Sequence, residues 1–344
     1  MSIPRRPPQV VVIRGEIRYN IKNRLEGGGS VKPNILVICG PTASGKTALA
    51  VELALQLNGE VVSADSMQVY RRMDIGTAKP TFGEMRGVPH HMLDVADPEE
   101  NYSVARYVQD AVPIVDDILA REKLPIVAGG TGLYIDSLVA GRQFAPFVPD
   151  SGLREHLQAR VKAEGLPALR RELEGVDRSA AAKIHPNDEK RTLRALEVYL
   201  STGKTITQFD AESRALSNRY TPLTIALSFQ ERPWLWERID RRVDQMMERG
   251  LEEEVRALLE AGVPRACTAM QAIGYKEIAA AILEGRPVSE GAQEVKLRSR
   301  QYAKRQLTWF RRNKQAYWFS WEKIPDFSAA LDFSTELVRE CGLQ

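Results

Sequence analysis

Residues 40–47 read Gly-Pro-Thr-Ala-Ser-Gly-Lys-Thr, and this octapeptide limits the possible folds of the chain more than any other stretch. An apolar, β-branched run at 35–39 precedes it, and a helix-forming run from 48 to 57 follows it. A glycine-containing turn with the spacing G-x-x-x-x-G-K-[ST], between a buried strand and a helix, is typical of a phosphate-binding loop. The sequence therefore predicts an α/β protein in which one strand of a parallel sheet ends in this loop.

The residue types of this loop fit a phosphate or a diphosphate ligand. Gly40 and Gly45 allow successive backbone N–H groups to face one anion, and the helix that begins near Lys46 directs its positive end there. The Lys46 ammonium supplies a point charge for terminal phosphate oxygens, and the Thr47 hydroxyl is placed to ligate a Mg²⁺ that bridges them. The predicted phosphate-binding residues are Gly40, Pro41, Thr42, Ala43, Ser44, Gly45, Lys46 and Thr47.

The composition is that of a soluble globular protein. The chain has 344 residues, of which 43% are hydrophobic and 27% charged, and this length allows one large or two ordinary domains. No apolar run reaches the roughly 18 residues of a membrane span, and the amino terminus lacks the apolar core of a secretory signal. Three widely spaced cysteines, Cys39, Cys267 and Cys341, indicate neither a disulfide framework nor a zinc site. We therefore expect a cytoplasmic protein.

Positive charge is concentrated near the C-terminus. The net charge is only +3, but residues 296–314 contain eight Lys or Arg and no acidic residue. Residues 1–33 contain seven basic and two acidic residues, so the rest of the chain is net acidic. A dense basic segment on an acidic body indicates a polyanionic partner that binds at a defined place.

Both ends of the chain differ in pattern from the middle. Residues 1–33, with early prolines and a Gly-Gly-Gly-Ser run, are interpreted as a flexible leader. A start codon assigned too early is the favoured explanation for this leader, and a transit peptide is the alternative. Residues 326–344 are expected to form a C-terminal tail.

The middle of the chain predicts a sheet domain with an insertion. Residues 34–143 and 221–325 alternate strand-like and helix-like segments, which predicts a P-loop NTPase-like parallel sheet flanked by helices as the catalytic core. Within this core, one helix is expected from 234 to about 259 and another from 289 to 313. Residues 144–220 show only helical patterns and predict an inserted all-helical subdomain.

One acidic residue follows the second predicted strand. Residues 60–65 read Glu-Val-Val-Ser-Ala-Asp, and ligands of open α/β sheets bind beyond the carboxyl ends of the strands, so Asp65 is expected near the phosphate loop. The strand at 125–128 ends in Gly129-Gly130 and lacks the Asp that holds Mg²⁺ in ATPases and GTPases. Asp65 is therefore interpreted as a general base, in a small-molecule kinase or in an alkyl transferase. An Asp that only caps the following turn is the alternative.

Eight segments, in order from about residue 35 to 320, share the pattern of one protein family. They are GPTASGKT (40–47), SADSMQVY (63–70), MDIGTAKP (73–80), PHHMLDV (89–95), VAGGTGLY (127–134), IHPNDEKRTLRALEVY (184–199), AMQAIGYKE (269–277) and QYAKRQLTWFR (301–311). Together they resemble the tRNA dimethylallyltransferases, also called tRNA isopentenyltransferases. The resemblance covers nearly all of the chain except the leader and the tail.

The resemblance implies transfer of the dimethylallyl group of dimethylallyl diphosphate to the exocyclic N6 of the adenosine adjacent to the anticodon in tRNA. Diphosphate is released, and the step uses Mg²⁺. By resemblance, Asp65 accepts the N6 proton, while Thr42 and Arg242 stabilise charge on the departing diphosphate, with Arg238 as the rival of Arg242. An adenylate isopentenyltransferase that acts on free AMP or ATP and a P-loop small-molecule kinase remain alternatives.

The expected partners are dimethylallyl diphosphate and the anticodon stem-loop of tRNA, with no membrane and no protein partner indicated. The amide of Gln68 has both a donor and an acceptor for a purine edge. In the segment 296–314, Trp309 and Phe310 are expected in the core and the cations are assigned to tRNA phosphates. Positions that match tRNA contacts of the family are Asp65, Ser66, Met67, Gln68, Thr131, Arg154, Lys190, Arg191, Thr192, Leu193 and Arg194.

Overall fold

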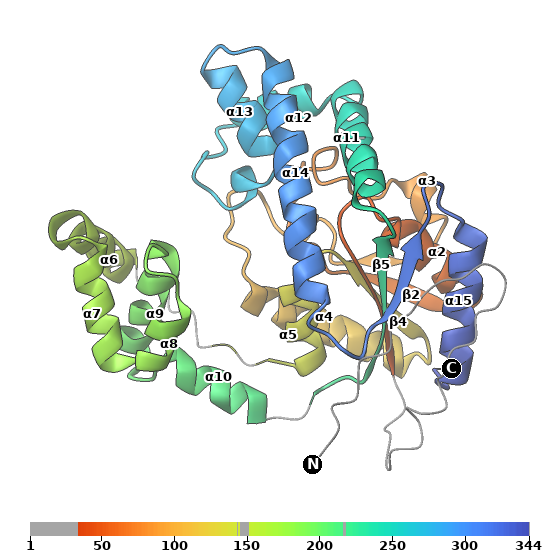
Figure 1. Cartoon of the computed structure of the whole chain (residues 1–344), viewed down its shortest axis with the longest axis horizontal. Coiled ribbons are helices and arrows are strands. Elements are labelled where there is room, and N and C mark those ends of the chain that lie inside the picture. Colours follow the sequence, from red (N-terminus) through yellow and green to blue (C-terminus); the bar gives the residue numbers. More distant parts are fainter. Residues whose placement is uncertain (1–33, 143, 145–150, 216–217, 344) are drawn as a thin grey trace. The chain divides into compact units, whose positions relative to one another are not determined.

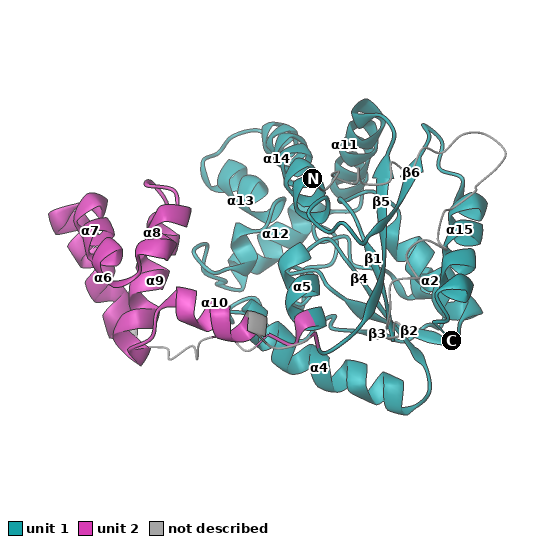
Figure 2. Cartoon of the chain, turned by 60° about the horizontal axis from the view of Figure 1, so that its bottom comes forward, with its two compact units in different colours: residues 1–139, 219–344 teal, residues 140–218 magenta. Residues whose placement is uncertain are grey.

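The computed structural model describes residues 34–142, 144, 151–215 and 218–343 (Figure 1). The chain divides into two compact units (Figure 2), one of residues 1–139 and 219–344 and the other of Ala140–Asn218. The predicted leader, 1–33, lies outside the described residues. Among the described residues, no helix combines the length and the apolar composition that a bilayer span requires.

The first unit is built on one six-stranded sheet in the order β3-β2-β4-β1-β5-β6. Every pair of neighbouring strands is parallel, which confirms the predicted parallel sheet. The strands are β1 (Ile35–Cys39), β2 (Gly59–Ser63), β3 (His90–His91), β4 (Leu124–Gly129), β5 (Pro222–Phe229) and β6 (Tyr317–Trp321). Because β1 and β2 both pair with β4, the segments that follow these three strands meet at one edge of the sheet.

Helices complete the first unit. They are α2 (Lys46–Gln56), α3 (Phe82–Met85), α4 (Val104–Ala120), α5 (Gly132–Ala140), α11 (Arg232–Glu248), α12 (Leu251–Glu260), the 3₁₀ turn η1 (Ala269–Gln271), α13 (Tyr275–Leu283), α14 (Val288–Phe310) and α15 (Phe327–Glu340). The single helix expected from 234 to 259 is two helices, α11 and α12. Gly250, with φ 94°, separates them, because only glycine takes this conformation without a steric penalty.

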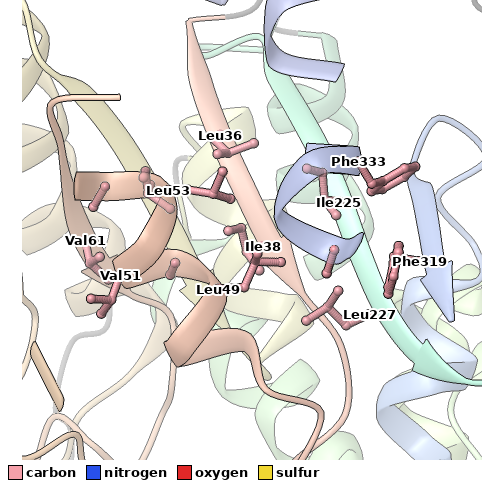
Figure 3. Packing of buried hydrophobic residues seen from close by; sticks show 14 of the residues in the cluster. Leu36, Ile38, Leu49, Val51, Leu53, Val61, Ile225, Leu227, Phe319 and Phe333 are labelled. Carbon is pink, nitrogen blue, oxygen red and sulfur yellow. The ribbon is translucent and has the colours of Figure 1, made fainter. Parts of the chain in front are cut away.

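The apolar core lies between the sheet and the helices that cover it. Leu36 and Ile38 of β1 and Ile225 of β5 pack against Leu49 of α2 and Phe333 of α15 (Figure 3). These five side chains are at most 1% exposed. The strands are apolar at consecutive positions because a parallel sheet is buried on both faces.

The expected C-terminal tail is instead helix α15. Ala330, Phe333, Leu337 and Val338 are buried, and their spacing of three and four residues places them on one side of the helix. The Asp326 side chain caps the helix by accepting a hydrogen bond from the Ala329 N–H. The buried side of α15, together with Leu343, therefore forms part of the core of the first unit.

The described part of the second unit consists of helices. They are α6 (Ser151–Glu164), α7 (Leu166–Val176), α8 (Arg178–Lys183), α9 (Glu189–Thr202) and α10 (Ile206–Ala215). Leu157, Leu169, Leu173, Leu193 and Leu196 form a separate apolar core. This unit therefore has the apolar contacts of a helical subdomain of its own.

Candidate active site at the carboxyl ends of the strands

The segments that follow β2 and β4 are in direct contact. The Ala64 N–H donates to the Ala128 carbonyl (2.9 Å), and the Thr131 N–H donates to the Ala64 carbonyl (3.1 Å). The Ser66 N–H donates to Thr131 Oγ1 (3.1 Å). A Cβ atom on Gly129 would lie 2.2 Å from the Ala64 oxygen, so this approach requires glycine. The glycine turn after β4 thus lies directly beside the Asp65 segment.

The phosphate loop after β1 has backbone conformations that suit glycine at two positions. Gly40 has φ 149° and Gly45 has φ 83°, and a Cβ on Gly40 would lie 2.6 Å from the Leu227 oxygen. Three loop carbonyls accept side-chain hydrogen bonds: Pro41 O from Lys46 Nζ (2.7 Å), Ala43 O from Arg238 Nε (3.1 Å) and Ser44 O from Trp321 Nε1 (2.8 Å). These bonds connect the loop to α2, α11 and β6.

Gln306 joins the phosphate loop to the turn after β4. Its Oε1 accepts a hydrogen bond from the Thr42 N–H (2.9 Å), and its Nε2 donates to the Gly130 carbonyl (2.9 Å). The side chain is buried on α14, on the same face as Ala303 and Phe310. Sequence reasoning missed Gln306. A polar residue three and four positions from apolar residues was the signal available for it.

Asp65 lies within electrostatic range of the phosphate loop. Burial lowers the pKa of the Lys46 ammonium to about 8, the charge of Arg242 lowers it as well, and the Asp65 carboxylate opposes both. Burial also lowers the pKa of Arg242, against the effects of Asp65 and Glu84. The loop lysine, a partly exposed arginine of α11 and the Asp65 carboxylate therefore lie within electrostatic range of one another.

The Asp65 carboxylate caps its own turn through one oxygen. Oδ1 accepts hydrogen bonds from the Met67 N–H (2.9 Å) and the Gln68 N–H (3.4 Å). Oδ2 accepts no hydrogen bond from residues that the structure describes. The two interpretations of Asp65, turn cap and general base, are thus compatible, since each uses a different oxygen.

Three tyrosines lie within electrostatic range of this carboxylate. Burial raises the pKa of Tyr302 to about 12, and the Asp65 carboxylate contributes to this increase. Burial and Asp65 also raise the pKa of Tyr107 and of Tyr134. The Tyr107 and Tyr134 rings stack with centroids 4.2 Å apart. The site therefore combines cations and one carboxylate, and the stacked rings of Tyr107 and Tyr134 are buried.

The amide of Gln68 is engaged within the protein. Its Oε1 accepts a hydrogen bond from Ser63 Oγ (3.1 Å), and its Nε2 donates to the Thr77 carbonyl (3.3 Å) and the Ala78 carbonyl (3.2 Å). A purine edge would have to displace one of these partners. The expected base-reading role of Gln68 stays a prediction, and the contacts in this structure favour a supporting role.

The predicted tRNA contacts of the second unit gather around α9. Arg154 and Arg194 both pair with Glu197, at 2.9 and 3.6 Å. Lys190 is exposed, and the exposed Arg191 pairs with Asp188 (3.5 Å). The side chains of the other two positions, Thr192 and Leu193, are buried. A contact made by this helix would therefore use the side chains of its cations and not those of Thr192 and Leu193.

The cations of 296–314 fall into two groups. Lys296 pairs with Asp244 (2.6 Å), and a single nitrogen of Arg300, Nη1, donates to both carboxylate oxygens of Asp240 (2.8 and 2.6 Å). Both aspartates lie on α11. The other six are exposed: Arg298, Lys314 and a group of four, Lys304, Arg305, Arg311 and Arg312. Positions seven apart in a helix lie nearly above one another, so these four lie on one side of α14 and its last turn. Two of the eight cations thus fasten α14 to α11.

The two aromatic residues near the end of α14 differ in burial. Phe310 is 5% exposed, as expected for the core. Trp309 is partly exposed, which corrects the expectation that it lies in the core. Its Nε1 donates to Asp136 Oδ2 (2.9 Å), and its ring covers Gly132, where a Cβ atom would lie 2.2 Å from Trp309 Cδ1.

Comparisons with known proteins agree on one family. The family model described as IPP transferase matches residues 68–313. Curated tRNA dimethylallyltransferases of Acetivibrio thermocellus and Caldanaerobacter subterraneus subsp. tengcongensis are 46% and 48% identical over 287 and 286 residues. Each alignment covers 83% of this chain and 91% of the relative.

Two solved structures extend the likeness to the fold. The full-length tRNA isopentenylpyrophosphate transferase from Bacillus halodurans has a TM-score of 0.66 and 42% identity, covering 90% of this chain and 98% of that one. A eukaryotic dimethylallyltransferase acting on tRNA has a TM-score of 0.73 and 28% identity, covering 89% of this chain and 79% of that one.

Proposed function

Because the chain belongs to the IPP transferase family, whose curated relatives are tRNA dimethylallyltransferases, we propose that it prenylates tRNA. The dimethylallyl group of dimethylallyl diphosphate goes to the exocyclic N6 of the adenosine adjacent to the anticodon. The observation that supports this chemistry best is the shared site of Lys46, Arg242 and Asp65. An anion cradle beside a carboxylate suits a reaction with a diphosphate leaving group and a proton to remove.

The reaction makes one bond and breaks one. The N6–C1 bond forms as the C1–O bond to diphosphate breaks, and the bonding electrons leave with the diphosphate. The N6 lone pair is delocalised into the purine ring, so the amine is a weak nucleophile and gains from losing its proton in the same step. Oδ2 of Asp65 takes this proton, while Lys46, Arg242 and Thr42 stabilise the charge on the diphosphate.

A Mg²⁺ ion fits the exposed start of α2. Thr47 is exposed in the first turn of that helix. No cluster of three His, Cys, Asp or Glu suited to a metal occurs in the described part of the chain. Mg²⁺ is commonly held by one or two protein oxygens together with substrate phosphates, so the Thr47 hydroxyl is sufficient as the protein ligand. Bound there, the ion would neutralise charge on the diphosphate.

Diphosphate binding is expected to take up protons above about pH 8. Burial lowers the pKa of Lys46 to about 8, and a bound polyanion raises it. The affinity for dimethylallyl diphosphate should therefore be highest below this pKa. It should fall as the pH rises above the pKa, by at most about tenfold per pH unit. Titration calorimetry of dimethylallyl diphosphate at about pH 8.5, in two buffers of different ionisation enthalpy, measures the uptake. Lys46→Met is the control, and equal uptake in wild type and control would contradict this assignment.

The exposed cations of α14 are proposed to contact tRNA phosphates. Each phosphate contact contributes about −0.7 to −0.9 to the slope of log K against log[salt]. Arg311→Ala and Lys304→Ala should each reduce the magnitude of this slope by about one contact. Lys296→Ala is the matched control, because Lys296 pairs with Asp244 and its side chain is only 14% exposed. Filter binding of tRNA at several salt concentrations measures the slopes, and a flat wild-type slope would refute the proposal.

The acceptor separates this function from its rivals. Labelled dimethylallyl diphosphate is offered with either AMP or an anticodon stem-loop that carries the target adenosine. Label on the stem-loop supports the proposal, and label on AMP alone supports an adenylate isopentenyltransferase. A third reaction, with γ-labelled ATP, tests the hypothesis of a small-molecule kinase, which would transfer the labelled phosphate. With three free cysteines and a tRNA substrate, we expect the enzyme in the cytoplasm.

A further inference from the structure

Two of the family-like segments, 73–80 and 269–277, have no part in the chemistry described so far, and the structure brings them into contact. A Cβ atom on Gly76 would lie 2.5 Å from the ring of Tyr275, so the backbone turn packs directly on that ring. Tyr275 is fully buried at the start of α13. The contact fixes one side of the turn that follows the Asp65 segment.

The carboxylate of Glu254, on α12, accepts four hydrogen bonds at this contact. Its Oε2 accepts from the Asp74 N–H (2.8 Å) and the Ile75 N–H (2.9 Å). Its Oε1 accepts from the Gly76 N–H (3.1 Å) and the Tyr275 hydroxyl (2.5 Å). Three successive backbone N–H groups that face one anion form a nest, and here a side chain of the protein is the anion. Glu254 therefore holds the turn from its donor side.

The next two residues of the same turn hold Gln68. The Thr77 and Ala78 carbonyls both accept hydrogen bonds from its Nε2. Its backbone N–H, with that of Met67, donates to Asp65 Oδ1. A series of hydrogen bonds, joined by the backbone of the turn, thus connects the Glu254 carboxylate with Gln68 and Asp65.

We propose that Glu254 is a positioning residue for the transfer reaction, which sets the turn 74–78 and through Gln68 orients the Asp65 carboxylate. The proposal rests on the proposed function of Asp65. Glu254 makes no hydrogen bond to the phosphate loop among the described residues. Its effect is therefore expected in the rate of transfer and not in the affinity for dimethylallyl diphosphate.

The first test is Glu254→Gln, which turns one acceptor oxygen into an NH₂ group facing N–H donors. We expect kcat to fall about 10- to 100-fold, since a displacement of about 1 Å at the reacting groups can cost this much. The dissociation constants of dimethylallyl diphosphate and tRNA should stay within about threefold. Glu252→Gln is the control on the same helix, because Glu252 pairs with Arg256 (2.7 Å), and it should match wild type. An unchanged kcat, or weakened binding without loss of kcat, would overturn the proposal.

A double-mutant cycle with Gln68→Asn tests whether Glu254 acts through Gln68. Asparagine is too short to keep the bonds to both carbonyls and the Ser63 hydroxyl. If the two residues belong to one series, the double variant is about as slow as the slower single variant. Multiplicative losses would show that Glu254 acts elsewhere and would overturn the proposal. If the wild-type enzyme prenylates the stem-loop but the losses of the two variants multiply, only the role of Glu254 is refuted. If the wild-type enzyme does not prenylate the stem-loop, the proposed function itself is refuted.

A milder variant keeps the test decisive if Glu254→Gln does not fold. Tyr275→Phe removes only the hydroxyl that donates to Glu254 and leaves the ring against Gly76. It should lower kcat by a few-fold in the wild-type background and by nothing further in Gln68→Asn. An equal loss of kcat in both backgrounds, or no loss of kcat in the wild-type background, would contradict the proposal that Glu254 acts through Gln68.

Discussion

Asp65→Asn is expected to lower the rate constant of transfer by about 100- to 10,000-fold, the contribution of a positioned general base. Asparagine retains an Oδ1 that can accept from the Met67 and Gln68 N–H groups, so the turn is preserved while the base is lost. The affinities for tRNA and for dimethylallyl diphosphate should change little. Single-turnover transfer to an anticodon stem-loop measures the rate constant.

Asp65→Ala completes this experiment, because it removes the base and the turn cap together. If Asp65 acts as the base, the two variants lose activity to a similar extent. If Asp65 serves only as the cap, the asparagine variant stays active while the alanine variant fails. Activity of Asp65→Asn near that of wild type would therefore remove Asp65 from the chemistry.

Arg242→Ala is expected to have the second largest effect, a loss of about 100- to 1000-fold in kcat, as for the removal of one preorganised donor to a developing anion. Arg242 interacts electrostatically with both Lys46 and Asp65. Arg238, the other candidate for the diphosphate contact, donates a hydrogen bond from its Nε–H to the Ala43 carbonyl. Arg238→Ala should therefore cost less and act through the loop conformation. Steady-state kinetics and diphosphate product inhibition separate the two.

Arg241→Ala is the matched control for both arginines, because Arg241 lies on the same helix and is exposed. It should leave kcat and KM unchanged. A larger loss in Arg238→Ala than in Arg242→Ala would assign the diphosphate contact to Arg238. Equal losses in all three variants would indicate a defect of α11 as a whole.

The parts of the site that are local in sequence could be predicted. The strand, loop and helix around residues 35–57 follow from a continuous pattern, and the proximity of Asp65 follows from the rule that parallel strands end at one edge. Helix α15 was not predicted, although its buried residues Ala330, Phe333 and Leu337 recur at helical spacing. Trp309 was misplaced because an indole can cover a glycine and keep its N–H at the surface.

The contacts that hold the site together could not be predicted. Gln306 bonds to Thr42 across 264 residues, and Glu254 bonds to Asp74 across 180 residues. The apolar spacing around Gln306 signals burial, but nothing local to a Gln or a Glu identifies a hydrogen-bond partner so far away in the sequence. The burial of Thr192 and Leu193 is likewise decided by the packing of the second unit and not by the basic pattern around them.

The phosphate loop and Asp65 are proposed to act on one pair of substrates. Quantifying diphosphate released and adenosine prenylated in the same reaction tests this proposal most directly, with wild-type enzyme, Mg²⁺, dimethylallyl diphosphate and the anticodon stem-loop. We expect one diphosphate for each five-carbon unit found on N6, and neither product without the stem-loop. Diphosphate release that continues without prenylated adenosine, or phosphate transfer from ATP in place of prenylation, would contradict it.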